Sequence, residues 1–138
     1  MKLKNVASST VALAIALTLS GCGPESPGDL RDKLEDAGAE DCDEPEQEEG
    51  EGWVGVQFDC ELAHVLSSTG ASGVTVTTFE DSGSVDAYVH DKNAWVRDPY
   101  VVGKNWIAHN SSYEHGEDST GFVKDTLGGE IRAGEPQP

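Results

Sequence analysis

The segment WVGVQFDCEL (residues 53–62) is the strongest strand signal in the chain and decides its fold class. Large apolar residues alternate with polar or small ones, and a period of two is typical of a strand with one buried face. The residues expected to point inward are Val54, Val56, Phe58, Cys60 and Leu62. A second strand, rich in Val and Thr, is expected over Val74–Phe79. The two strands are expected to pair as an antiparallel hairpin with a long loop.

Short helices and a second hairpin are expected on either side of this pair in the sequence. Ser26 can cap a helix with Pro27 at its first position, and Gly38 is well placed to end that helix. Further helices are expected over residues 85–92 and 119–127, with a hairpin over residues 100–108 between them. The predicted order is therefore α-β-β-α-β-β-α, and Ile131 could add a short edge strand.

These elements predict an α+β fold of two layers. An antiparallel sheet of about four strands would carry all the short helices on one face, which is an economical way to bury amphipathic elements. Residues 40–51 contain eight acidic residues and no large apolar one, so we expect an exposed acidic loop there. Its spacing lacks the glycine and final glutamate of a twelve-residue calcium loop, although calcium binding stays an alternative.

The N-terminal residues have the three parts of an export signal. Lys2 and Lys4 precede an uncharged apolar run over residues 6–19, which is shorter than the roughly 20 residues of a membrane-spanning helix. The run ends in Leu19-Ser20-Gly21-Cys22, which resembles the lipobox of bacterial lipoproteins. That resemblance implies cleavage before Cys22 and attachment of a diacylglyceryl group to its sulfur, with further acylation, as by palmitate, of its amine.

The expected organisation follows from this resemblance. Residues 1–21 would be a signal peptide, 22–27 a lipidated tether, 28–132 a single domain, and 133–138 a flexible tail. Two or three acyl chains on one residue give stable membrane attachment, whereas one chain holds reversibly. We therefore expect an exported protein that is anchored to the cell membrane, with its domain outside the cytoplasm.

Two cysteines, Cys42 and Cys60, remain if Cys22 is lipidated. An even pair in an exported chain most simply forms a disulfide, and closing this loop would stabilise the fold by roughly 3 kcal/mol. A free thiol pair or a metal site are the alternatives. The spacing of the two cysteines matches no zinc pattern, and no histidine lies between them.

The charge of the chain excludes a class of partners. It has 9 basic and 26 acidic residues, and removal of residues 1–21 would leave 7 basic residues, for a net charge of −19. Such a protein has no basic surface with which to neutralise phosphates, so nucleic acid is not an expected partner.

Several motifs are similar to those of small exported proteins of high-GC Gram-positive bacteria, many of which carry a lipobox. The similarity covers residues 29–132 and includes Val-Thr-Val-Thr-Thr-Phe (74–79), Asp-Ala-Tyr-Val (86–89) and Val-Val-Gly-Lys-Asn-Trp-Ile (101–107). It supports the fold and the disulfide, and it implies no catalytic residue.

No catalytic, cofactor or metal site is assigned from the sequence. His109 and His115, with nearby acidic residues, form a His/carboxylate cluster, but their spacing matches no metal signature. Trp53 has outward parity on its strand and Trp95 lies in an irregular stretch, so both are candidates for surface recognition.

The favoured function is a lipid-anchored module that binds an envelope protein or a cell-wall component. A small envelope enzyme with an unrecognised site is one alternative. A calcium or metal binder, through residues 40–51 or 109–118, is another.

Overall fold

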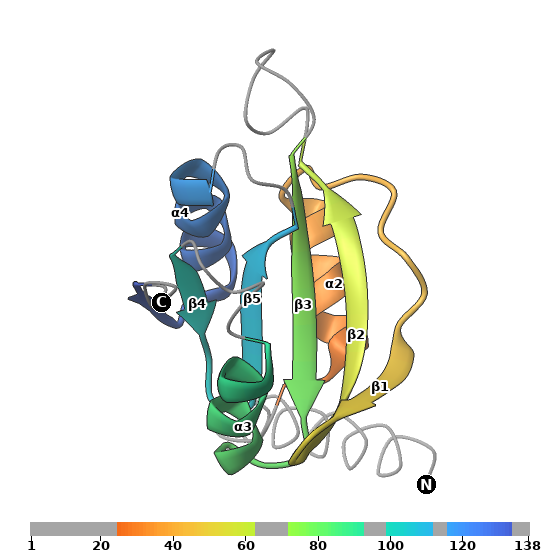
Figure 1. Cartoon of the computed structure of the whole chain (residues 1–138). Helices are drawn as coiled ribbons and strands as arrows, with labels where there is room; N and C mark the ends of the chain where they lie inside the picture. Colours follow the sequence, from red (N-terminus) through yellow and green to blue (C-terminus); the bar gives the residue numbers. More distant parts are fainter. Residues whose placement is uncertain (1–24, 63–71, 93–98, 112–115, 134–138) are drawn as a thin grey trace, which may run out of the picture.

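The computed structural model describes residues 25–62, 72–92, 99–111 and 116–133. In these ranges the protein is a mixed α and β fold, with one antiparallel sheet of six strands and three helices (Figure 1). The helices are α2 (Pro27–Asp36), α3 (Gly83–Asp91) and α4 (Gly116–Leu127). The strands are β1 (Glu46–Gly50), β2 (Trp53–Glu61), β3 (Gly73–Phe79), β4 (Tyr100–Val102), β5 (Trp106–Asn110) and β6 (Glu130–Arg132). Their order in the sheet is β1-β2-β3-β5-β4-β6.

The expected hairpin of β2 and β3 is confirmed and forms the middle of the sheet. Phe58 lies opposite Val76 and Cys60 opposite Val74, so the apolar residues of the two strands share a face. Every residue of β3 is buried. A strand that is buried along its whole length must be covered on both faces.

Helix α2 begins as the sequence predicts. The Ser26 hydroxyl accepts a hydrogen bond from the Asp29 backbone N–H at 3.1 Å, and Pro27 occupies the first turn. Leu30 and Leu34, one turn apart, are fully buried against the sheet. The helix therefore starts inside the segment that was expected to be a tether.

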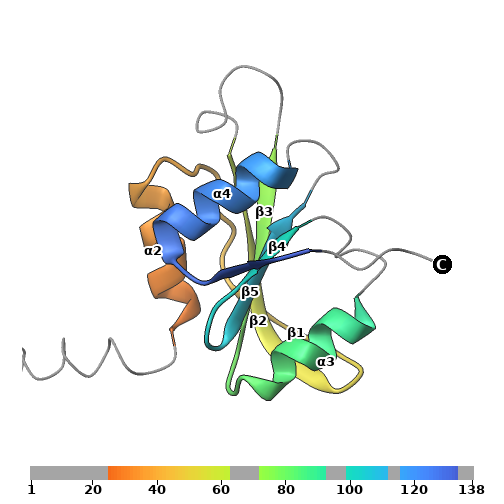
Figure 2. The same ribbon diagram turned by 90° about the vertical axis from the view of Figure 1, so that its left-hand side faces the viewer.

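The helices cover both faces of the sheet, and the expected two-layer arrangement is wrong. Figure 2 shows α2 and α4 on one side of the sheet and α3 on the other. Under α2 and α4 lies a cluster built on Leu30, Phe58 and Val123, and under α3 a second cluster is built on Trp53, Phe79 and Tyr88. The molecule therefore has three layers, with the sheet in the middle.

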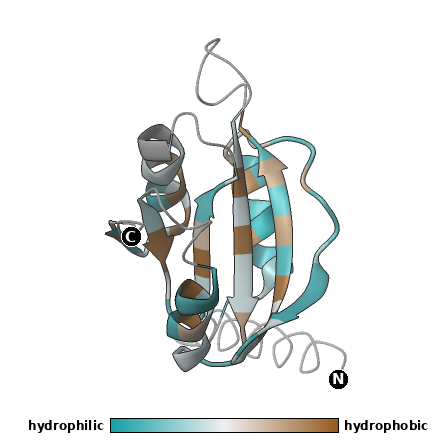
Figure 3. Ribbon diagram, in the orientation of Figure 1, coloured by the Kyte–Doolittle hydropathy of each residue, from teal (hydrophilic) through white to brown (hydrophobic). Residues whose placement is uncertain are grey.

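The expected sheet of about four strands is also too small, because an edge strand lies at each end. At one end, β6 pairs with β4, and at the other, β1 pairs with β2 from Glu46 opposite Gln57 to Gly50 opposite Trp53. The acidic segment 40–51 is thus not simply a loop (Figure 3). The turn that returns the chain into β2 uses Gly52, whose φ of +83° favours glycine.

Candidate binding surfaces

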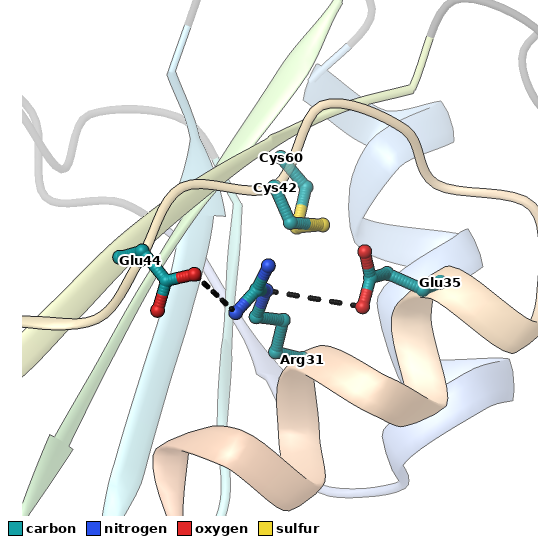
Figure 4. The surroundings of a disulfide bond; sticks show 5 residues. All are labelled: Arg31, Glu35, Cys42, Glu44 and Cys60. Atoms are coloured by element: carbon teal, nitrogen blue, oxygen red, sulfur yellow. Dashed lines mark ion pairs between the residues drawn. A yellow bond between two sulfur atoms is a disulfide. The ribbon is translucent and has the colours of Figure 1, made fainter.

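The predicted disulfide between Cys42 and Cys60 is present, with a Cα–Cα distance of 4.0 Å. It ties the start of the acidic segment to β2 and belongs to the core under α2. Beside it, Arg31 of α2 lies between two carboxylates, 3.8 Å from Glu35 and 3.5 Å from Glu44 (Figure 4). The disulfide thus holds the acidic segment to β2, and the ion pair between Arg31 and Glu44 links the same segment to α2.

The prediction that Trp53 is exposed for recognition is wrong. Its side chain is 4% exposed and makes an edge contact with Tyr88, at a ring separation of 4.8 Å. Its indole N–H donates a hydrogen bond to Asp91 at 2.8 Å, at the end of α3. The outward parity of Trp53 on β2 was correct, but α3 covers that face. Trp53 is therefore a core residue, and Trp95 lies outside the described residues.

Other predicted residues also lie outside the described ranges. These are the lipidation residue Cys22, His115 and the tail after residue 133. Of the proposed His/carboxylate cluster, His109 is described and lies on β5 under the α3 face.

His109 forms a hydrogen-bonded pair with Tyr88 of α3. The Nε2 atom lies 3.1 Å from the Tyr88 hydroxyl, and Nδ1 lies 3.2 Å from the Asn110 carbonyl. Because a carbonyl oxygen only accepts, we assign the hydrogen to Nδ1, which leaves Nε2 to accept from the Tyr88 O–H. Burial lowers the pKa of His109, and burial likewise raises the pKa of Tyr88. Both groups are therefore held neutral.

This pair is suited to positioning rather than to proton transfer. Both imidazole nitrogens are engaged, so neither is available to a substrate. Asp59, Thr75 and His109 lie opposite one another on β2, β3 and β5 and form a cross-strand row. In this row the Thr75 hydroxyl donates a hydrogen bond to the Asp59 carboxylate at 2.5 Å. The row brings together residues from β2, β3, β5 and α3, a juxtaposition that the sequence reasoning missed because the four are distant along the chain.

All five residues of the edge strand β1 are exposed, as are the three residues of β6 at the opposite edge. The backbone of Glu61 in β2 exchanges two hydrogen bonds, of 2.7 and 2.9 Å, with the backbone of Glu40 in the acidic segment. Because backbone groups alternate in direction along a strand, the odd-numbered residues of β2 direct their N–H and C=O groups toward β1. Glu46, Glu48 and Gly50 face those residues in the register. Their backbone groups point inward, and those of Gln47 and Glu49 therefore point away from the sheet.

A strongly acidic hollow of about 370 Å³ adjoins β1. Its charged lining comes from the acidic segment, β1 and β2: Asp43, Glu44, Glu46, Glu48 and Asp59. Within the described ranges, no group of three or more His, Cys, Asp or Glu residues is arranged to hold a metal ion.

Asn105, a buried residue that precedes β5, fixes the backbone of Glu25 just before helix α2. Its side chain accepts from the Glu25 N–H at 2.9 Å and donates to the Glu25 carbonyl at 3.0 Å. It also donates to the Phe79 carbonyl at 2.9 Å, so three of its side-chain hydrogen bonds fix the backbone of two distant segments. A groove of about 920 Å³ lies beside this junction, and Val54, 52% exposed, is among its lining residues.

Comparisons with known proteins found no relative. No protein-family model matches the chain, and neither a curated protein nor a solved structure matches it. Among the residues that the structure describes, no helix is long and apolar enough to cross a membrane.

Proposed function

We propose that the protein is an exported, lipid-anchored binding module, held to the membrane through Cys22. The proposal rests on the lipobox-like residues 19–22, and the fixed position of Glu25, three residues after Cys22, bears on how the domain would sit relative to the anchor. Three residues of extended chain reach at most about 11 Å. The domain would begin almost at the lipid and would lie close to the membrane surface.

The disulfide supports an oxidising location. Structural disulfides persist in exported proteins and are rare in the reducing cytosol. The pairing of Cys42 with Cys60 also leaves Cys22 as the third cysteine, as lipid attachment requires. The anchor and the disulfide are therefore compatible uses of the three cysteines.

The described residues support a binding role better than an enzymatic one. Both ring nitrogens of His109 are hydrogen-bonded within the protein, to the Tyr88 hydroxyl and the Asn110 carbonyl. The exposed acidic β1 offers backbone groups and charge for a partner. We place the binding function at this outer surface, with an envelope protein or a cell-wall component as the partner.

The anchor is tested by the intact mass of protein extracted from native membranes, with and without reductant. We expect the mass of residues 22–138 plus acyl chains, with a gain of two hydrogens on reduction. Cys22→Ser should move the protein out of the lipidated membrane fraction. The matched double variant Cys42→Ser/Cys60→Ser should keep its lipid. An unlipidated mass for the unaltered protein contradicts the anchor.

A further inference from the structure

We propose that the outer edge of β1 binds an extended segment of another polypeptide, rich in lysine or arginine, as an added strand of the sheet. This inference rests on the proposed binding function but not on the lipid. The backbone N–H and C=O groups of Gln47 and Glu49 point outward, and within the described ranges β1 pairs with β2 alone. A free edge of this kind supplies the main-chain hydrogen bonds of strand addition.

Three of the five residues of this edge are glutamates, whose charge opposes pairing with an acidic strand, but other devices that block strand addition are missing. Its five residues include no proline and no lysine, and its register with β2 runs residue for residue without a bulge. The edge at the other end of the sheet is less suited, since β6 has three residues and Glu130 and Arg132 lie 3.7 Å apart as an ion pair. The longer and more open template is β1.

Charge selects the partner of β1. Glu46, Glu48 and Glu49 would face like charges if a second copy of the chain added its own β1, and like charges opposite each other destabilise a sheet. A basic segment would instead be attracted by these glutamates. Its side chains on the α3 face would also lie beside the acidic hollow that Asp43 and Asp59 help to line. The occupant is therefore a basic extended peptide and not a second copy.

The first test uses the mature protein in non-ionic detergent and a fluorescent ten-residue peptide that alternates lysine and valine. We expect binding that weakens as salt rises from 50 to 300 mM, and no binding of a peptide that alternates glutamate and valine. Methylation of every second backbone nitrogen, in the phase that faces β1, should abolish binding, whereas the other phase should not. If neither phase changes the affinity, the contact is charge attraction alone and the strand-addition proposal fails.

The second test separates the backbone of β1 from its charge. Glu49→Pro removes an outward N–H and a carboxylate, and Glu49→Ala removes the carboxylate alone. Both leave the inward hydrogen bonds of Glu48 and Gly50 to β2. We expect Glu49→Pro to bind the lysine peptide about tenfold more weakly than Glu49→Ala. Equal affinities of the two variants, with equal urea midpoints, overturn the proposal, and the methylated peptides test it on the unaltered protein.

Sedimentation completes the design. A dimer of the unaltered protein that Glu49→Pro dissociates would make a second copy the occupant of the edge and would overturn the basic partner. The anchor and the edge fail separately, because an unlipidated mass leaves peptide binding intact, and loss of peptide binding leaves the lipid in place.

Discussion

The two faces of the sheet are covered by different chemistry. The face under α2 and α4 is mainly aliphatic, with Leu30, Leu34 and Val123 of the helices packed on Phe58 and the disulfide. The face under α3 is aromatic and polar. There, Trp53 and Tyr88 pack edge to face, and each also makes a side-chain hydrogen bond. The first face depends on buried area, and the second depends in addition on the direction of specific donors and acceptors.

The aliphatic face should show the largest loss when its central ring is removed. Phe58 is 2% exposed, and Phe58→Ala is expected to lower the free energy of unfolding by about 4 kcal/mol, from lost burial and the cavity that remains. Urea denaturation measures the loss. Val54→Ala, on the same face and strand but largely exposed, should change stability by less than about 0.5 kcal/mol. Equal losses for the two would contradict the assignment of this face as the core.

Removal of the disulfide should have the next largest effect. The cysteines are 18 residues apart, and Cys42→Ala/Cys60→Ala is expected to cost about 3 kcal/mol of unfolding free energy. Thermal denaturation of the double variant, compared with the unaltered protein with and without reductant, checks this value. A reduced protein as stable as the oxidised one would show that the cross-link contributes little to this face.

The aromatic face is tested by Trp53→Phe, which keeps a ring and removes the donor to Asp91. We expect a loss of about 1 to 2 kcal/mol, because the carboxylate then loses a hydrogen bond as the ring becomes smaller. A double-mutant cycle with Asp91→Ala isolates the pair. A coupling free energy near zero would reduce the difference between the faces to buried area alone.

The contribution of His109, on the α3 face, to the pH dependence of stability should be the smallest of these effects. Burial lowers the pKa of His109, while the Asn110 carbonyl and the charge of Asp59 oppose the shift. Below about pH 6.5 the unfolded chain takes up a proton that the folded protein resists. The unfolding free energy should therefore fall as the pH is lowered, by at most about 1.4 kcal/mol per pH unit from this group.

Urea titrations of the unaltered protein and of His109→Gln between pH 5 and 8 measure this term. The carboxylates titrate in both proteins, so the difference between the two curves belongs to His109. Parallel curves would mean that His109 is not held neutral by its surroundings.

The sequence could reveal the aliphatic face but not the aromatic one. Alternation along β2 identified Phe58 and Cys60 as inward residues, and both are buried. The opposite set begins with Trp53 and continues with polar residues, so it resembles a solvated face. Its cover comes from α3, whose position across the sheet depends on tertiary packing and not on local pattern. A clue existed in β3, because a continuous run of Val and Thr is typical of a strand covered on both sides.

The candidate binding surface was hidden for a different reason. Glutamate is unfavourable in strands, so a segment such as Glu46–Gly50 is not predicted to be one. The structure shows that pairing with β2 overrides this preference, aided by Gly50. Any side chain added at Gly50 would come within 2.3 Å of the Trp53 indole nitrogen and would also meet the Asp91 carboxylate. In a single sequence, the only sign of this close approach between the backbone of β1 and the Trp53 and Asp91 side chains is the glycine itself.

The hydrogen bonds of Asn105 have a mechanical consequence. Tension on the chain before Glu25 reaches the pair of bonds between Glu25 and Asn105 before it reaches α2. Asn105 is bonded through its backbone and its side chain to Phe79, at the end of the central strand β3. A pulling force is therefore directed into the middle of the sheet, where many strands share it. Helix α2 is protected from being unwound from its N-terminal end.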